Sequence, residues 1–148
     1  MKVRHRAREF ALQMLFEWDM THKKPARVRQ HFWRSAGATD ATRKFADQLF
    51  EGALAQVESA DALITTLSEN WSLDRLAAID RNILRLAIYE FRSGTAPVKV
   101  VIDEALELAK KFSSEEAPAF LNGVLDAVLK ALESAAAKGA EKGAASGS

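Results

Sequence analysis

Apolar residues recur at every third or fourth position along most of this chain, which is the spacing of one face of an α-helix. The first such stretch lies between residues 4 and 18, and its shared face consists of Ala7, Ala11, Met14, Leu15 and Trp18. A second helix is predicted over about residues 25–35, because Pro25 suits the first turn of a helix and Gly37 suits the position after its end. The beginning of the chain therefore predicts two amphipathic helices.

The middle of the chain continues the same period. Thr39 or Asp40 can cap a third helix. Helical spacing then persists to residue 67, and the pattern leaves open whether one helix runs through or two helices meet near Ser59. The next interruption is predicted at residues 70–72. The segment 79–91 is apolar over more than half its circumference, which predicts a helix at the centre of the fold.

Two further helices are predicted after residue 97. The β-branched residues between 98 and 102 also suit a short strand, but the apolar face continues at helical spacing to Phe112, which favours a helix. Ser113 and Glu116 have the spacing of a capping box, which predicts the start of the last helix. Gly123 falls within an unbroken helical period and is predicted to let another helix approach closely. No strand alternation occurs, so the fold is predicted to be all-α.

The last residues differ in composition from the rest. After residue 134 the chain contains only Ala, Gly, Ser, Lys and Glu, without any large apolar side chain. Such a segment buries too little surface to offset the entropy of ordering it. We therefore expect one helical domain over residues 1–134 and a disordered low-complexity tail over residues 135–148.

Charge changes the picture more than composition does. The chain of 148 residues is long enough for one buried core, has no apolar run that could cross a membrane, and has no cysteine for disulfide or thiolate chemistry. Its net charge of +1 conceals an uneven distribution: residues 1–34 hold nine Lys and Arg against three acids, and the remainder holds twelve against seventeen. A basic end on an acidic body is typical of proteins that bind a polyanion. A solvated helix end without a partner explains it equally well.

Catalytic or metal chemistry is not indicated. The three histidines are scattered, whereas zinc requires three or four converging ligands. Phosphate-binding loops and nucleophile elbows are absent. The acids between 103 and 107 share their helix with Lys99, Lys110 and Lys111, which predicts a salt-bridged face. We therefore expect no enzyme, no cofactor and no metal ion.

The basic residues that open the chain carry the one positive functional signal. They alternate as Lys2, Arg4, Arg6 and Arg8. Arginine forms bidentate contacts with phosphates and stacks on unpaired bases. We expect these side chains to stay in solvent, to contact RNA and to contribute little to stability. A second basic cluster, between residues 23 and 34, is interpreted as a solvated face.

Four blocks of the sequence resemble the NusB family of bacterial transcription antitermination factors. They are RHRAREFALQMLFEWD, IDRNILRLAIYEF, PVKVVIDEALELAKKF and FLNGVLDAVL, and their order and spacing agree over residues 3–133. The resemblance implies a compact fold of about seven helices in two small bundles, without catalysis or cofactor. It also implies binding to the boxA element of ribosomal RNA leader transcripts, together with a ribosomal small-subunit protein called NusE in this role. The complex would act on RNA polymerase in the cytoplasm, away from any membrane.

The resemblance also assigns residues to these partners. RNA contact falls on Arg4, Arg6 and Arg8, on Glu116 and on Phe120. His5 and Ala7 interrupt the basic start, so its positive charge is less dense than in the family's richest examples. Phe120 would stack on an RNA base, and the alternative is a core residue at the start of the last helix.

For the protein partner, the resemblance points to Phe16 and Asp80. The family commonly has tyrosine at the first position, so Phe16 lacks one hydroxyl. Asp80 has an equally good alternative as a favourable charge at a helix start.

Two other functions remain open from the sequence. One is a stand-alone RNA-binding module like that of the ribosomal RNA cytosine methyltransferases, since the tail is too short to hold a methyltransferase domain. The other is a helical protein-interaction or oligomerisation module that binds no nucleic acid. Salt dependence separates the two classes, because binding to phosphates releases counterions and an apolar interface does not.

Overall fold

The computed structural model describes residues 2–67 and 73–146, with side chains described for residues 3–67 and 73–139. Within these ranges the chain is all-α, as predicted, and contains no strand. The elements are α1 (Lys2–Thr21), α2 (Pro25–Ser35), α3 (Asp40–Ala55), α4 (Val57–Leu67), the 3-10 helix η1 (Leu73–Arg75), α5 (Ala78–Ser93), α6 (Val98–Phe112) and α7 (Ala117–Ser146). The open question near Ser59 is thereby answered, because α3 and α4 are separate helices that meet at Gln56. The predicted interruption at residues 70–72 lies outside the described residues.

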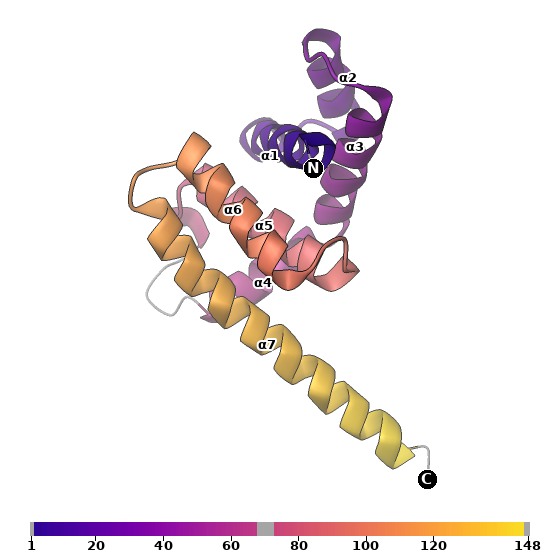
Figure 1. Cartoon of the computed structure of the whole chain (residues 1–148), viewed down its shortest axis with the longest axis vertical. Helices are drawn as coiled ribbons and strands as arrows, with labels where there is room; N and C mark the ends of the chain where they lie inside the picture. The colour runs from indigo at the N-terminus through magenta and orange to yellow at the C-terminus, as the bar shows by residue number, and fades with distance from the viewer. Residues whose placement is uncertain (1, 68–72, 147–148) are drawn as a thin grey trace.

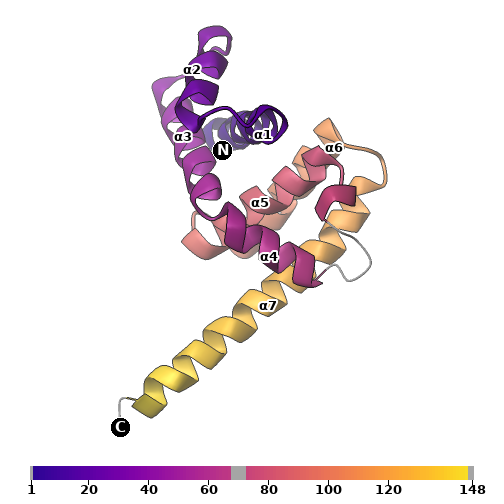
Figure 2. The same ribbon diagram turned by 180° about the vertical axis from the view of Figure 1, so that it is seen from behind.

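The helices form two groups that share α5. Helices α1, α2 and α3 pack together in one group, and α4, α6 and α7 surround α5 in the other (Figures 1 and 2). Helix α5 also contacts α1 and α3, so it connects the two groups. The segment predicted to lie at the centre of the fold does so, which confirms the inference from its apolar circumference.

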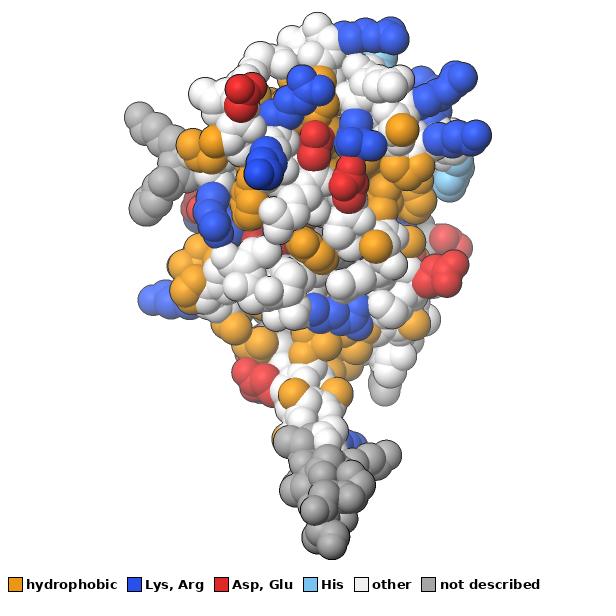
Figure 3. Space-filling model, turned by 90° about the vertical axis from the view of Figure 1, so that its right-hand side faces the viewer, with side chains coloured by type: hydrophobic (Ala, Val, Ile, Leu, Met, Phe, Trp, Pro, Cys, Tyr) orange, Lys and Arg blue, Asp and Glu red, His pale blue; other side chains and the backbone are white. Residues whose placement is uncertain are grey.

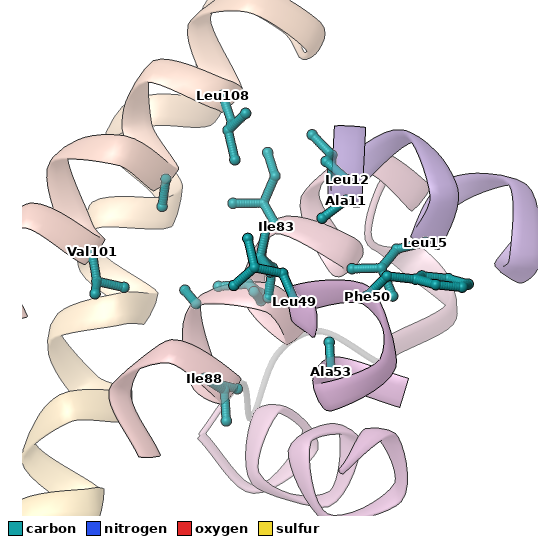
Figure 4. Close-up of a cluster of buried hydrophobic side chains, with 14 of the residues drawn as sticks. Ala11, Leu12, Leu15, Leu49, Phe50, Ala53, Ile83, Ile88, Val101 and Leu108 are labelled. Carbon is teal, nitrogen blue, oxygen red and sulfur yellow. The ribbon is translucent and has the colours of Figure 1, made fainter. Parts of the chain in front are cut away.

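The core is built from the apolar faces that the helical period predicts. Leu12 and Leu15 of α1 point toward Leu49 and Phe50 of α3 and toward Ile83 of α5 (Figure 4), and all five are fully or almost fully buried. Val101 and Leu108 extend this core into α6. Burial of a large aliphatic or aromatic side chain contributes about 1.5–3 kcal/mol. The interleaved faces of α1, α3 and α5 therefore fix how the start of α1 sits on the body.

Local sequence explains where several helices begin and end. The hydroxyl of Thr39 accepts a hydrogen bond from the amide of Thr42 at 3.2 Å and so caps α3. Gly94 has φ of 66°, a left-handed conformation that glycine adopts without steric cost, and its amide donates to the carbonyl of Glu90 at 3.0 Å. The turn after α5 thereby brings Thr95 back toward α1.

Two predictions about α7 are wrong. Ser113 is not part of a capping box: it ends α6, and its hydroxyl donates to Oδ1 of Asp80 at 2.6 Å, which engages it with a different helix. Gly123 is exposed and no described atom lies within 4 Å of the position of a Cβ atom there. The close approach occurs instead at Gly52, where a Cβ atom would lie 2.2 Å from the ring of Tyr89.

Helix α7 also continues beyond the predicted end of the ordered domain. It extends to Ser146 and projects away from the body (Figure 1). Alanine has the highest helix propensity, and lengthening an existing helix avoids the cost of nucleation. The side chains of residues 133–139 are exposed, so the proposal that this segment is dispensable stays a prediction. Among the described residues, no helix has the length and apolar character needed to cross a membrane.

Candidate nucleic-acid interface

Two of the predicted arginines lie on the surface at the start of α1. The side chain of Arg6 is 53% exposed, and its guanidinium lies over the ring of Phe10 at 4.5 Å. Arg4 is also exposed, but it is held in place: Nη1 donates to the carbonyl of Thr95 at 2.6 Å, and the guanidinium lies over Phe45 at 4.7 Å. Both groups are ordered by aromatic faces while remaining open to solvent. Arg6 has the greater freedom to reach a ligand.

The expectation that Arg8 stays in solvent is wrong. Its side chain is 3% exposed and forms a bidentate pair with Glu90 of α5, with Nε donating to Oε2 at 3.0 Å and Nη2 to Oε1 at 2.8 Å. The hydroxyl of Thr95 donates to the same carboxylate at 2.8 Å. A buried guanidinium in this geometry cannot reach a phosphate. Arg8 therefore links α1 to the centre of the fold.

A nearly buried carboxylate organises the other basic groups at this end. Glu9 is 4% exposed. Its carboxylate oxygens lie 3.1 Å from Nε2 of His5 and 3.4 Å from Nη1 of Arg6, and they also pair with the ammonium of Lys111. His5 also contacts Oε2 of Glu104 at 2.7 Å through Nδ1. The carboxylate of Glu9 is therefore shared by three basic groups. We call His5, Arg6 and Lys111, together with Glu9, the α1 basic end.

The salt-bridged face predicted for α6 is only partly present. Lys110 pairs with Glu107 at 3.2 Å, as the spacing predicts. Glu104 and Lys111 instead contact α1. Lys111 is 54% exposed and was not predicted as part of the site, because a charge at helical spacing from acids gives no sign that its partner lies on another helix. Its position nevertheless extends the basic surface toward the connection between α6 and α7.

Glu116 and Phe120 lie at that connection. Glu116 is exposed just before α7, and its carbonyl accepts from the amide of Phe120 at 3.3 Å. Phe120 is half-buried and packs against the core. This packing supports the alternative of a core residue, although Phe120 as a whole is only half-buried. RNA contact by both residues stays a prediction. The side chain of Lys2 lies outside the described residues.

The opposite end of α1 is a buried ionic network. Oδ2 of Asp19 accepts from Nη2 of Arg81 at 2.7 Å and from Nδ2 of Asn82 at 3.1 Å, and it pairs with Nη1 of Arg85 at 3.1 Å. Arg85 also forms a bidentate pair with Asp61, with both distances at 2.8 Å. Burial alone would favour neutral Asp19, but the hydrogen bond from Arg81, the charge of Arg85 and the hydrogen bond from Asn82 together lower its pKa below the ordinary value.

This network brings together the elements that carry Phe16 and Asp80. Phe16 is half-buried on α1 about one turn before Asp19. Asp80 lies in the first turn of α5 beside Arg81, is 7% exposed, and accepts the hydrogen bond from Ser113. The low exposure of Asp80 supports its alternative role as a charge at a helix start. Across the residues that the structure describes, no group of three potential metal ligands occurs.

Comparison with known proteins identifies the family of this chain. The model of the NusB family matches residues 5–130, which is most of the chain. The chain belongs to the NusB family. It is 45% identical over 130 residues to the transcription antitermination protein NusB of Solibacter usitatus, covering 86% of this chain and 88% of that protein. The protein is therefore a transcription antitermination factor and not an enzyme.

Solved structures of NusB share the fold. The solution structure of NusB from Aquifex aeolicus superposes with a TM-score of 0.81 at 29% identity, covering 91% of this chain and 93% of that chain. A crystal structure of the antitermination factors NusB and NusE in complex with double-stranded RNA superposes with a TM-score of 0.77 at 30% identity, covering 88% of this chain and 98% of that one. The two-group helical architecture is thus that of the NusB family.

Proposed function

We propose that this protein is an RNA-binding transcription antitermination factor. It recognises the boxA element of ribosomal RNA leader transcripts together with a ribosomal small-subunit protein acting as NusE. The complex joins RNA polymerase in the cytoplasm. The solved complex of NusB with NusE and RNA supports both partners, and the recognition of boxA rests on the sequence resemblance.

The α1 basic end is the observation that carries the proposal. Arg6 and Lys111 are both more than half exposed, and they share one nearly buried carboxylate, Glu9, with His5. The surface therefore presents two exposed cations in a fixed arrangement, while the acids that pair with these basic groups, Glu9 and Glu104, are themselves mostly buried. Phosphate contacts supply most of the affinity for a nucleic acid. Arg4 adds a further exposed guanidinium, whereas Arg8 contributes through the fold and not through contact.

The proposal includes base contacts from the start of α7. Phe120, which is half-buried, would stack on an unpaired base, and Glu116 would accept hydrogen bonds at the same surface. Stacking on an aromatic side chain is worth about 1–3 kcal/mol per base. These contacts would supply the sequence preference that phosphate contacts lack.

The experiment is a titration of labelled boxA RNA, with a scrambled RNA of the same length, in the presence and absence of the ribosomal protein. We expect boxA RNA to bind more tightly than the scrambled RNA, and the ribosomal protein to increase the difference. Equal affinity for both RNAs under both conditions would contradict boxA recognition. Binding of neither RNA, with intact binding to the protein, would indicate a protein-interaction module instead.

We further propose that Phe16 and Asp80 contribute to binding of the ribosomal protein. They lie on elements that the pair between Asp19 and Arg81 joins. Asp80→Asn removes the charge and keeps an acceptor for Ser113, so it should weaken the complex while the melting temperature stays within a few degrees. Ser113→Ala is the matched control that keeps the charge. Equal loss with both variants would assign Asp80 a purely structural role.

A further inference from the structure

A second group of basic side chains lies on α2, and the RNA site proposed above does not use it. Lys23, Arg27, Gln30, His31 and Arg34 line a shallow hollow of about 430 Å³ on this helix and the turn before it. No acid is among these lining residues. Lys and Arg side chains gather in the upper part of the molecule, where α2 lies (Figures 1 and 3). We call Lys23, Arg27, His31 and Arg34 the α2 basic surface.

The nearby acids Glu17 and Glu51 pair with basic groups other than Lys23, Arg27 and Arg34. Glu17 contacts Nδ1 of His31 at 2.8 Å. Glu51 pairs with Arg29 at 2.9 Å. Over the part of the chain with described side chains, no carboxylate lies within ion-pair distance of the three remaining cations, which are Lys23, Arg27 and Arg34. These cations remain exposed and without local neutralisation.

Helical spacing arranges the surface as a stripe. Residues 27, 31 and 34 follow one another at intervals of four and three positions, and such residues are neighbours on one side of a helix. The other side of α2 is held by its aromatic residues, because Phe32 and Trp33 both lie 5.4 Å from the ring of Phe10 on α1. The stripe is therefore fixed on the body and faces solvent.

The end of α2 lies close to the α1 basic end. Ala38 and Thr39, which follow α2, line a hollow together with His5 and Arg6. The turn after α2 therefore lies beside Arg6, and the stripe from Arg34 to Lys23 begins a few residues before that turn. A helix of 11 residues is about 16 Å long, so the stripe is long enough to contact several consecutive phosphates.

We propose that the α2 basic surface binds the phosphates of single-stranded RNA that continues beyond the segment held at the α1 basic end. This inference rests on the proposed RNA-binding function and adds a second contact region to it. The lining of the hollow favours RNA over an acidic protein, because no apolar residue lines it and protein interfaces have an apolar centre. Cations alone are sufficient to hold a phosphate backbone.

The test compares a short RNA with an extended RNA and uses two triple variants of the full chain. The short RNA contains boxA alone. The extended RNA is made in two forms, with about ten extra nucleotides at one end or at the other, so that it reaches past α2, which is about 16 Å long. The first variant is Lys23→Ala, Arg27→Ala and Arg34→Ala. The matched control is Arg75→Ala, Lys99→Ala and Lys130→Ala, which removes three exposed positive charges from η1, α6 and α7.

We expect the wild-type protein to bind one of the extended RNAs more tightly than the short one. The α2 variant should lose this gain. Each lost phosphate contact lowers the slope of log affinity against log salt by about 0.7 for a single strand, so the slope for the extended RNA should fall by about two. The slope for the short RNA should not change, and the control variant should bind both RNAs like wild type.

Three results would overturn the inference. They are an α2 variant that binds the extended RNA like wild type, an equal loss on the short RNA, and an equal loss in the control variant. Loss of polyglutamate binding in the α2 variant, together with unchanged binding of the extended RNA, would likewise overturn it in favour of an acidic protein partner. A wild-type protein that binds neither RNA would refute the proposed function itself, which keeps the two failures distinct.

Discussion

The first two turns of α1 have two sides that use the same residue type for different purposes. Arg6 faces solvent and is 53% exposed, while Arg8 faces the core and is 3% exposed. Two residues along a helix correspond to a rotation of about 200°, so neighbours in an alternating basic pattern face opposite ways. On the solvent side, several basic groups share Glu9; on the core side, Arg8 is the one cation paired with Glu90 among the described residues, and the carboxylate of Glu90 also accepts from the hydroxyl of Thr95.

The comparison shows that the available counter-charge decides what each arginine does. A guanidinium with a complete bidentate partner can be buried, because the carboxylate replaces the hydrogen bonds lost from water. The guanidinium of Arg6, which shares Glu9 with Lys111, stays in solvent and keeps attraction for another anion. The solvent side of α1 is therefore suited to binding, and the core side to holding α1 against α5.

The largest effect should come from breaking the pair on the core side. Arg8→Ala leaves the carboxylate of Glu90 buried with, among the described side chains, only the hydroxyl of Thr95 as a hydrogen-bond donor. Removing one member of a buried pair costs about 3–5 kcal/mol. Chemical denaturation should show this loss, and the double variant Arg8→Met with Glu90→Gln should recover part of it. A loss below about 1 kcal/mol would mean that burial of Arg8 is not needed for stability.

A smaller effect is expected at the other end of α1, and it should depend on pH. The lowered pKa of Asp19 means that its pairs contribute stability that is present above its ordinary pKa of 3.8 and is lost as pH falls through the still lower pKa in the folded protein. Asp19→Asn should lower stability at neutral pH by about 1–3 kcal/mol, because it leaves buried donors underpaired. It should also flatten the decline of stability below pH 4, which denaturation curves at several acidic pH values would reveal. An unchanged acid slope would contradict the assignment.

The same residues show which features of the fold and the site can be predicted from the sequence. Helical periodicity predicts the core faces of α1, α3, α5 and α6, because burial of a stripe is a local property of the pattern. It does not reveal the burial of Arg8, since Glu90 lies 82 positions away and nothing in the alternation of bases marks it. The contacts of Lys111 with Glu9, of Ser113 with Asp80 and of Gly52 with Tyr89 were missed for the same reason. These contacts depend on which helices pack together in the folded protein.

The end of α7 is a third region, and it tests whether exposed side chains contribute little to the free energy of unfolding. The side chains of residues 133–139 are exposed, although α7 continues through them to Ser146. Truncation after residue 134 should change the free energy of unfolding by about 0.5 kcal/mol or less, since exposed positions rarely contribute more. Helicity by circular dichroism should fall by the length removed while the midpoint of thermal unfolding stays constant. A midpoint lowered by several degrees would show that this part of α7 packs on the body.

The difference between the two sides of α1 is tested most directly by the salt dependence of RNA binding in the Arg6→Ala variant. Lys130→Ala, on the exposed part of α7, is the matched control for the loss of one positive charge. For Arg6→Ala we expect the slope of log affinity against log salt to fall by about 0.7, with stability within about 0.5 kcal/mol of wild type. The control should leave both quantities unchanged. An Arg6→Ala protein that binds boxA RNA with the wild-type affinity and slope would contradict the assignment of the α1 basic end to RNA.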